Sequence, residues 1–332
     1  MVITKTPFRM SFFGGGTDIP NYFRENCGAV LSTTFDKYCY VNVRHLPRFF
    51  DYTTELSYSK TERITDVESI EHPAIREAMK MLDMHEIRLT YEADLPARSG
   101  LGTSSSFAVG MLNAFYALKG KYADKKKLAD EAIYLERVLC REAGGWQDQI
   151  AASFGGFNRI NFNADGYEIF PVIISPERKQ RLNENLMMFF TGFTRFSSEV
   201  QKVNNVSAEN KRNQLREMYK LVDEAERILT DSESDLDDFG RLLDHTWQLK
   251  KQTGTAISTG SIDAFYEKGI KAGALGGKLL GAGGGGFLVF YVQPEYKNAV
   301  MNAMKDLMYI PFAFESVGTR VIHYSPETYI PR

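Results

Sequence analysis

The strongest constraint on this chain is a run of glycine and hydroxyl residues, LPARSGLGTSSSF at Leu95–Phe107, directly before an apolar helical pattern. The first turn of a helix leaves backbone N–H groups unpaired and carries the positive end of the helix dipole, which suits it to bind an anion. Glycine and serine also form ordinary loops and caps. The segment therefore predicts a helix start preceded by either a phosphate site or a plain loop.

Two further glycine-rich segments lie far away along the chain, FFGGGTD at Phe12–Asp18 and GAGGGG at Gly281–Gly286. Because glycine permits close approach of the backbone, three such interruptions predict either three tight turns or separate backbone segments around one ligand. No segment has the GxxxxGK[ST] spacing, and no GxGxxG joins a strand to a helix. A phosphate site here must be of another type.

Length and composition indicate a two-domain protein with small-molecule partners. The 332 residues exceed the roughly 100–200 of one domain. A formal net charge of −2 provides no basic surface for nucleic acid, and the glycine-filled apolar run Leu279–Val292 is too short to span a membrane. The three cysteines lack the spacing of a zinc site or a disulfide framework. We expect a cytoplasmic monomer or homodimer that binds neither nucleic acid nor membrane.

The order of the patterns predicts an α+β fold, with strands before the glycine loop and helices directly after it. Period-two spacing predicts a first strand over Val2–Phe13, with Val2, Phe8, Met10 and Phe12 on one face. A hairpin is expected around Phe35–Lys37.

A polar segment near residues 175–185 marks the expected boundary between an N-terminal domain, 1–180, and a C-terminal domain, 181–332. The second half shows helical patterns over 197–229, 236–251 and 296–308, and a strand pair within 312–324. These elements predict helices packed on a mixed or antiparallel sheet.

A triphosphate needs more than a helix terminus, which stabilises a nearby anion by only about 0.3–1 kcal/mol at an exposed site. Mg²⁺ is held by carboxylates or hydroxyls together with substrate phosphates. A serine of the loop and a carboxylate from elsewhere are therefore required. Glu136, close to the core face of the next helical segment, is one candidate, although an exposed ion-paired glutamate fits the same pattern.

Asp148 follows a glycine pair at the start of a short apolar helix in REAGGWQDQIAASFGGF. An aspartate there is either a helix-terminal charge or a general base. Arg9 alternates with apolar residues on the first strand, and its burial requires a carboxylate or phosphate partner, for which Asp148 is a reasonable candidate. No HExxH or GxSxG pattern supports a histidine metal site or a serine nucleophile.

Taken together, PFRMSFFGGGTD, PARSGLGTSSS, ERVLCREAGGWQDQ and GGKLLGAGGGGF resemble the successive motifs of the GHMP kinases, the galactokinase, homoserine, mevalonate and phosphomevalonate kinase superfamily. The resemblance follows the same order over most of the chain. It implies an N-terminal domain with a left-handed crossover, a ferredoxin-like C-terminal domain, and ATP with Mg²⁺ in the cleft between them.

The same resemblance assigns roles to individual residues. It places Asp148 as the base that abstracts or orients the proton of the sugar's anomeric hydroxyl, with Arg9 as its partner. It assigns Mg²⁺ to Ser104 and Glu136. The residues that it places around the nucleotide phosphates are Ser99, Gly100, Leu101, Gly102, Thr103, Ser104 and Ser105.

The segment GGGTD departs from the galactokinase pattern GEHTD, because Gly15 and Gly16 replace a glutamate and a histidine that contact the sugar, while Asp18 is retained. Together with TGFTRFSSE at Thr191–Glu199, it is similar to the heptose 7-phosphate kinase branch. That similarity implies phosphorylation at O1 of D-glycero-D-manno-heptose 7-phosphate, giving the 1,7-bisphosphate for nucleotide-activated heptose synthesis.

The sugar phosphate needs its own cationic contacts. The residues assigned to it are Gly14, Gly15, Gly16, Thr17, Asp18, Gly283, Gly284 and the basic candidates Arg195, Lys250, Lys251 and Lys278, each of which also fits an ordinary surface charge. Two alternatives remain open: a kinase of a neutral hexose, of the L-fucose or galactose type, and a non-catalytic sugar or nucleotide sensor on the same fold. Retention of Arg9, Glu136 and Asp148 argues against the sensor.

Overall fold

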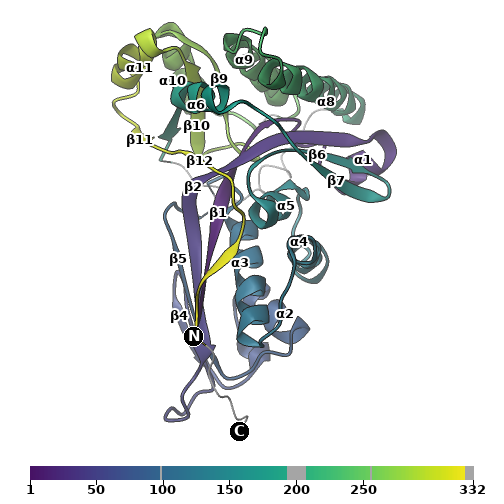
Figure 1. The fold of residues 1–332 in the computed structure, drawn as a ribbon, viewed down its shortest axis with the longest axis vertical. Coiled ribbons are helices and arrows are strands. Elements are labelled where there is room, and N and C mark those ends of the chain that lie inside the picture. Colours follow the sequence, from purple (N-terminus) through teal and green to yellow (C-terminus); the bar gives the residue numbers. More distant parts are fainter. Residues whose placement is uncertain (98, 193–206, 255, 326–332) are drawn as a thin grey trace.

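The computed structural model describes residues 1–97, 99–192, 207–254 and 256–325, and contains two sheets covered by helices (Figure 1). The strands are β1 (Val2–Phe13), β2 (Gly28–His45), β3 (Thr54–Ser57), β4 (Thr61–Ile64), β5 (Ile87–Ala93), β6 (Phe157–Asn163), β7 (Gly166–Pro171), β8 (Leu186–Phe190), β9 (Ala274–Leu279), β10 (Phe287–Val292), β11 (Met308–Ile310), β12 (Phe314–Glu315) and β13 (Arg320–Tyr324). The helices are α1 (Pro20–Asn26), α2 (Pro73–Met81), α3 (Thr103–Leu118), α4 (Lys125–Tyr134), α5 (Gln147–Phe154), α6 (Pro176–Asn185), α8 (Ala208–Thr230), α9 (Asp237–Lys251), α10 (Gly260–Lys271) and α11 (Lys297–Ala303), with a π-helical turn at Leu135–Leu139.

The first sheet contains nine strands in the order β13-β1-β2-β5-β3-β4, with β6 and β12 also paired to β2, and β7 paired to β6. Helices α2 to α5 lie on one side of it (Figure 1). The core on that side combines strand residues such as Val41 and Leu89 with Phe115 of α3. This arrangement places the start of α3 and the start of α5 beside β1.

The expected hairpin around Phe35–Lys37 is wrong, because β2 continues through this segment as one strand. Its pairing with β1 shifts between Pro7 and Phe8, so that two residues of β2 bulge out of the ladder. The bulge is stabilised from a distant part of the chain, since the Asp36 N–H donates to the Ala313 carbonyl at 2.9 Å and the Ala313 N–H donates to the Asp36 carboxylate at 2.8 Å. A local pattern carries no sign of such a remote partner.

The same shift changes which side of β1 faces α3. Before it, the Thr4 hydroxyl donates to the Gly110 carbonyl of α3 at 2.9 Å; beyond it, Arg9 reaches the loop before α3. Val2 therefore lies in the core beside α3, whereas Phe8 and the alternate residues after it lie in the core toward the second sheet. The single apolar face expected along this strand is divided in two.

The second sheet has four antiparallel strands in the order β11-β8-β10-β9. Helices α8 to α10 lie between β8 and β9 in the chain, and α11 lies between β10 and β11. This βαββαβ arrangement confirms the expected ferredoxin-like domain. No helix within the described ranges is both long and apolar enough to cross a membrane.

The strand pair expected in the second sheet over 312–324 belongs instead to the first sheet, because β12 pairs with β2 and β13 pairs with β1. The last described residues thus run back along β1 toward the N-terminus (Figure 1). The expected helix at 296–308 is shorter than predicted and is followed by β11. The division into domains 1–180 and 181–332 stays a prediction, and β12 and β13 join the first sheet despite lying in the second range.

Aromatic side chains connect the two sheets. Phe239 of α9 packs edge-to-face on Phe12 and Phe13 of β1, with ring centroids 5.3 and 5.1 Å apart. The same core cluster includes Val222 of α8 and Val289 of β10. The two domains therefore share a continuous apolar core directly beside the end of β1.

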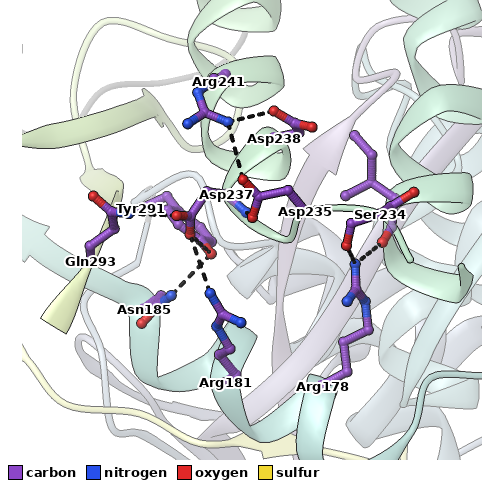
Figure 2. Close-up of polar contacts among 11 residues, drawn as sticks. Arg178, Arg181, Asn185, Ser234, Asp235, Asp237, Asp238, Arg241, Tyr291 and Gln293 are labelled. Carbon is purple, nitrogen blue, oxygen red and sulfur yellow. Dashed lines mark hydrogen bonds and ion pairs between the residues drawn. The ribbon is translucent and has the colours of Figure 1, made fainter. Parts of the chain in front are cut away.

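A buried carboxylate holds α9 against the second sheet (Figure 2). Asp237, in the first turn of α9, accepts hydrogen bonds from the Tyr291 hydroxyl at 2.8 Å and from the Gln293 amide. Arg181 of α6 lies 3.9 Å from the same carboxylate. Because these partners come from β10, the residue after it and α6, they hold in place the helix whose far end carries Lys250.

Candidate functional site

Two of the three glycine-rich segments are in direct backbone contact. Gly100 has a φ of +83°, and a Cβ atom there would lie 2.4 Å from the Leu280 carbonyl oxygen. Gly281, with a φ of +82°, faces Gly100 equally closely, and Gly286 packs on the Ser99 carbonyl. Only residues without a Cβ allow this approach. The loop before α3 and the loop after β9 therefore meet.

Helix α3 begins with free polar groups at this contact. Its N-cap, Gly102, adopts the left-handed conformation, and no side chain of the described residues caps the helix. Thr103 is buried and Ser104 is exposed on the first turn. An uncapped helix start of this kind leaves N–H groups available to an anion.

The third glycine-rich segment forms a turn at the end of β1 that is held by Thr17. The Thr17 hydroxyl lies 2.8 Å from the Gly14 carbonyl and 2.9 Å from the Ala29 carbonyl, and it accepts the Ala29 N–H at 3.1 Å. A Cβ atom on Gly14 would meet the Ala29 carbonyl oxygen at 1.8 Å. Thr17, expected at the sugar, thus uses its hydroxyl to hold the turn against β2.

Asp18 connects this turn to the start of α5. Its carboxylate accepts the Gly16 N–H at 3.0 Å and the Gln147 N–H at 3.3 Å, and the residue is buried. Burial raises the pKa of Asp18, and the charge of Asp148 raises it further, whereas the two N–H donors and Lys250 lower it. The turn and the segment that carries Asp148 are therefore held together by one carboxylate.

The structure brings the expected pair Arg9 and Asp148 into contact. The Arg9 Nε donates to the Asp148 Oδ1 at 2.7 Å, and the Arg9 guanidinium also donates to the Gly100 carbonyl at 2.6 Å. The Leu101 carbonyl accepts the Arg9 backbone N–H at 3.1 Å. The Arg9 side chain is 5% exposed, whereas that of Asp148 is 24% exposed. A Cβ on Gly102 would lie 3.3 Å from the Asp148 carboxyl carbon, so the loop and this accessible carboxylate lie side by side.

The structure also brings Glu136 to the loop serines. Glu136 lies on the π-helical turn after α4, a feature that is frequent at functional sites. Its two oxygens accept the Ser104 and Ser105 hydroxyls, each at 2.7 Å, and the Gln149 amide donates to the same carboxylate. Glu136 is 1% exposed and forms no ion pair within the part of the chain that the structure describes. The result is a buried carboxylate with uncharged donors.

These oxygen donors suit Mg²⁺ in kind. A carboxylate and a hydroxyl are among its usual protein ligands, and substrate phosphates and waters complete its shell. Across the described ranges, no group of three His, Cys, Asp or Glu side chains is placed to hold a metal ion. Ser104 and Glu136 therefore fit Mg²⁺ together with phosphate oxygens, and without them they supply too few ligands.

Two lysines of the second domain reach the turn at the end of β1. The Lys278 Nζ donates to the Phe12 carbonyl at 2.7 Å, and the Lys250 Nζ donates to the Gly15 carbonyl at 3.4 Å. Burial lowers the pKa of both lysines; Lys250 and Arg9 lower that of Lys278 further, whereas Asp18 raises that of Lys250. Three basic side chains therefore lie beside two carboxylates, and an anionic ligand would favour the charged form of both lysines.

The remaining candidates lie elsewhere. Arg195 falls outside the described residues. Lys251 lies 3.6 Å from Asp263 in a partly exposed ion pair. Gly283 and Gly284 pack within the second domain, where the Gly284 N–H donates to the Ile257 carbonyl at 3.0 Å. The assignment of Arg195, Gly283 and Gly284 to the sugar phosphate stays a prediction.

Two polar residues at this site were missed by sequence reasoning. Gln149, fully buried in α5, donates to Glu136. Ser11, on β1, has a buried hydroxyl without a hydrogen-bond partner among the residues that the structure describes. The available signal was the same for both, namely a polar residue inside an otherwise apolar strand or helix pattern. That signal indicates burial and does not indicate a partner.

Comparison with known proteins identifies the family. Residues 69–156 match the model of the GHMP kinases N terminal domain, and residues 218–310 match that of the GHMP kinases C terminal domain. D-glycero-alpha-D-manno-heptose 7-phosphate kinase of Campylobacter jejuni is 29% identical over 96% of this chain and 97% of its own. The bifunctional fucokinase/GDP-fucose pyrophosphorylase of Arabidopsis thaliana is 25% identical over 88% of this chain and 30% of its own. A crystal structure of a D-glycero-D-manno-heptose 1-phosphate kinase from Bacteroides thetaiotaomicron shares 22% identity with a TM-score of 0.78, covering 98% of this chain and all of that one.

The two family models match in the order of the two domains and together cover more than half of the residues. The chain therefore belongs to the GHMP kinases.

Proposed function

We propose that this ATP-dependent sugar kinase phosphorylates O1 of D-glycero-D-manno-heptose 7-phosphate to give the 1,7-bisphosphate. The observation that carries the choice of a sugar phosphate is the pair of lysines beside the glycine turn and Arg9, the buried Lys278 and the partly buried Lys250. A neutral sugar offers these two lysines no counter-charge, whereas a phosphate group does and would favour their charged forms. The names of two similar proteins, which both contain a heptose phosphate, support the same class of substrate.

We infer that the triphosphate of ATP lies against the uncapped start of α3, over Gly100 to Ser105. Ser104 and Glu136 would hold Mg²⁺, which when bound neutralises charge on the phosphate oxygens. The Arg9 guanidinium lies at the same loop through its bond to the Gly100 carbonyl, which places a fixed positive charge there. Such preorganised charge stabilises phosphoryl transfer in a site from which water is excluded.

Asp148 is the proposed base. Because Arg9 bonds its Oδ1, the second carboxylate oxygen can accept the proton of the sugar's anomeric hydroxyl. The sugar O1 then forms a bond to the γ-phosphorus as the bond to the bridging oxygen breaks, and ADP leaves. A positioned base contributes about 10²–10⁴ in rate.

A kinase of a neutral hexose is the second candidate, favoured by the similarity to the plant fucokinase. Gly15 and Gly16 carry no side chain that could select a hydroxyl pattern, so the turn itself excludes no hexose. The two candidates share the base, its partner arginine and the phosphate loop. They differ in whether Lys250 and Lys278 contact the acceptor.

A coupled ADP-release assay distinguishes the candidates. The acceptors are heptose 7-phosphate, heptose 1-phosphate, the free heptose, L-fucose and galactose. We expect the highest kcat/KM with heptose 7-phosphate, and we expect Lys250→Met and Lys278→Met to raise its KM. Lys251→Met, which removes a lysine already paired with Asp263, is the matched control. A higher kcat/KM with any unphosphorylated sugar, or an unchanged KM in both lysine variants, would overturn the choice of a sugar phosphate.

A further inference from the structure

Ser11 carries a buried hydroxyl that no described residue bonds. The residue is 5% exposed, and its Oγ has no hydrogen-bond partner within residues 1–97, 99–192, 207–254 and 256–325. Buried polar groups in folded proteins are almost always hydrogen-bonded, because an unpaired one loses its bonds to water and gains nothing in return. An unpaired hydroxyl at the edge of a binding site therefore indicates a ligand that supplies the missing bond.

The position of Ser11 on β1 directs it to the same site as Arg9. The two residues are separated by one position in a regular part of the ladder, where Arg9 pairs with Thr34 and Ser11 pairs with Ser32. Side chains two apart on a strand point to the same side of the sheet. Since Arg9 points to Asp148, Ser11 points to that side as well.

The glycine turn leaves room in front of this hydroxyl. A Cβ atom built on Gly15 would lie 3.8 Å from the Ser11 Oγ, and that oxygen is the single described neighbour within 4 Å of it. The Gly15 carbonyl accepts a hydrogen bond from the Lys250 Nζ. Ser11 therefore lies between Arg9, the partner of the proposed base, and Lys250, the lysine proposed for the sugar phosphate. The body of an acceptor would extend through this region.

We propose that Ser11 is a specificity-determining residue whose hydroxyl bonds a ring hydroxyl of the acceptor sugar. The proposal rests on the proposed function only in requiring a sugar acceptor, and it holds for a neutral sugar as well as for a sugar phosphate. The nucleotide phosphates are assigned to the loop Gly100 to Ser105, so the Ser11 hydroxyl contributes to recognition of the acceptor and not of ATP.

The test uses Ser11→Ala with Ser153→Ala as its matched control. Ser153 is fully buried and, like Ser11, its hydroxyl has no partner in the described part of the chain, but it lies at the far end of α5 from Asp148. For Ser11→Ala we expect a fall of about tenfold in kcat/KM for the sugar that the wild type phosphorylates best, with the KM for ATP unchanged. We expect neither variant to melt at a lower temperature, because each loses an unpaired buried hydroxyl. Ser153→Ala should retain the wild-type kinetics.

Deoxy sugars identify the hydroxyl that is bound. With the 2-, 3- and 4-deoxy analogues of the preferred acceptor, one analogue should be phosphorylated equally well by the wild type and by Ser11→Ala, because either change removes the same bond. Ser11→Thr, which keeps a hydroxyl, gives a second variant and should retain more activity than Ser11→Ala.

Three results would overturn the inference: unchanged kcat/KM in Ser11→Ala, an equal loss in Ser153→Ala, or a change confined to the KM for ATP. The failure of the proposed function is distinguishable, because it shows in the wild type as a preference for another sugar. In that case the Ser11 variants are measured with that sugar. A wild type that phosphorylates no sugar would refute both.

Discussion

Replacing Asp148 with asparagine keeps the size and shape of the side chain and removes its charge. Arg9 can still donate its Nε to the amide oxygen and keeps its bond to the Gly100 carbonyl. The variant therefore isolates loss of the base from loss of the local structure. A positioned base contributes about 10²–10⁴ in rate, so the barrier should rise by about 2.7–5.5 kcal/mol.

The expected loss of stability is smaller. Breaking a fully buried ion pair costs about 3–5 kcal/mol. In this pair Arg9 is almost fully buried, but the Asp148 side chain is 24% exposed, and asparagine retains one hydrogen bond. Water therefore screens part of the lost interaction, and we expect a decrease of about 1–2 kcal/mol in the free energy of unfolding.

Single-turnover phosphoryl transfer with saturating Mg·ATP measures the kinetic effect, and calorimetric titration with ATP measures nucleotide binding. We expect Asp148→Asn to bind ATP like the wild type while transfer slows by at least a hundredfold. Asp263→Asn, which changes a partly exposed aspartate paired with Lys251, is the matched control. Transfer by Asp148→Asn within tenfold of the wild type would refute the assignment of Asp148 as the base.

Three further predictions concern the loop, the metal and the buried lysine. Glu136→Gln removes a carboxylate ligand, so it should reduce turnover by at least about tenfold and raise the Mg²⁺ concentration needed for half-maximal rate. A magnesium titration measures this concentration, and an unchanged titration curve would argue against metal binding at Glu136. Gly100→Ala should lower the free energy of unfolding by at least about 1–2 kcal/mol in urea denaturation, because Gly100 has a φ of +83° and its Cβ would meet the Leu280 carbonyl at 2.4 Å; a fully stable variant would show that the two loops can separate. Burial lowers the pKa of Lys278 well below 10.5, and the charges of Lys250 and Arg9 lower it further. Between the pKa of Lys278 in the native protein and its pKa in the unfolded chain, the unfolded chain therefore binds more protons. The free energy of unfolding should therefore rise with pH in that window in the wild type, and less so in Lys278→Met.

The parts of the fold that depend on local pattern could be predicted from the sequence. The bounds of the first strand, Val2–Phe13, and the helix ending at Lys251 follow periodicity that is strong within one segment. The continuity of β2 could not be predicted, because the bulge at Asp36 is stabilised by Ala313, far along the chain. The return of β12 and β13 to the first sheet has the same cause, since a strand pattern does not state which sheet it joins.

In the candidate site, too, the sequence indicates which residue types are needed but not which residues contact each other. A triphosphate site requires a metal ion and a carboxylate to hold it, and the sequence offers Glu136 for this role. In the structure the Ser104 and Ser105 hydroxyls donate to the two oxygens of Glu136. Among the basic candidates the sequence offered no ranking, because Lys250 and Lys251 are adjacent on one helix. The helix rotation of about 100° per residue places the first beside Gly15 and the second beside Asp263.

The contacts between the domains bear on which sugars can fit. Lys278 belongs to the second sheet, yet its ammonium is bonded to the Phe12 carbonyl of β1, three residues from Arg9. Gly281, two residues after the end of the same strand β9, packs on the Gly100 backbone. Strand β9 and the two residues after it thus carry both the proposed phosphate contact and the glycine that touches the loop before α3, so the backbone positions Lys278 relative to the Arg9–Asp148 pair. If Lys278 contacts the phosphate of the acceptor as proposed, a sugar phosphate must match this span to place O1 at Asp148, and we expect kcat/KM to fall for sugar phosphates with a longer or shorter carbon chain.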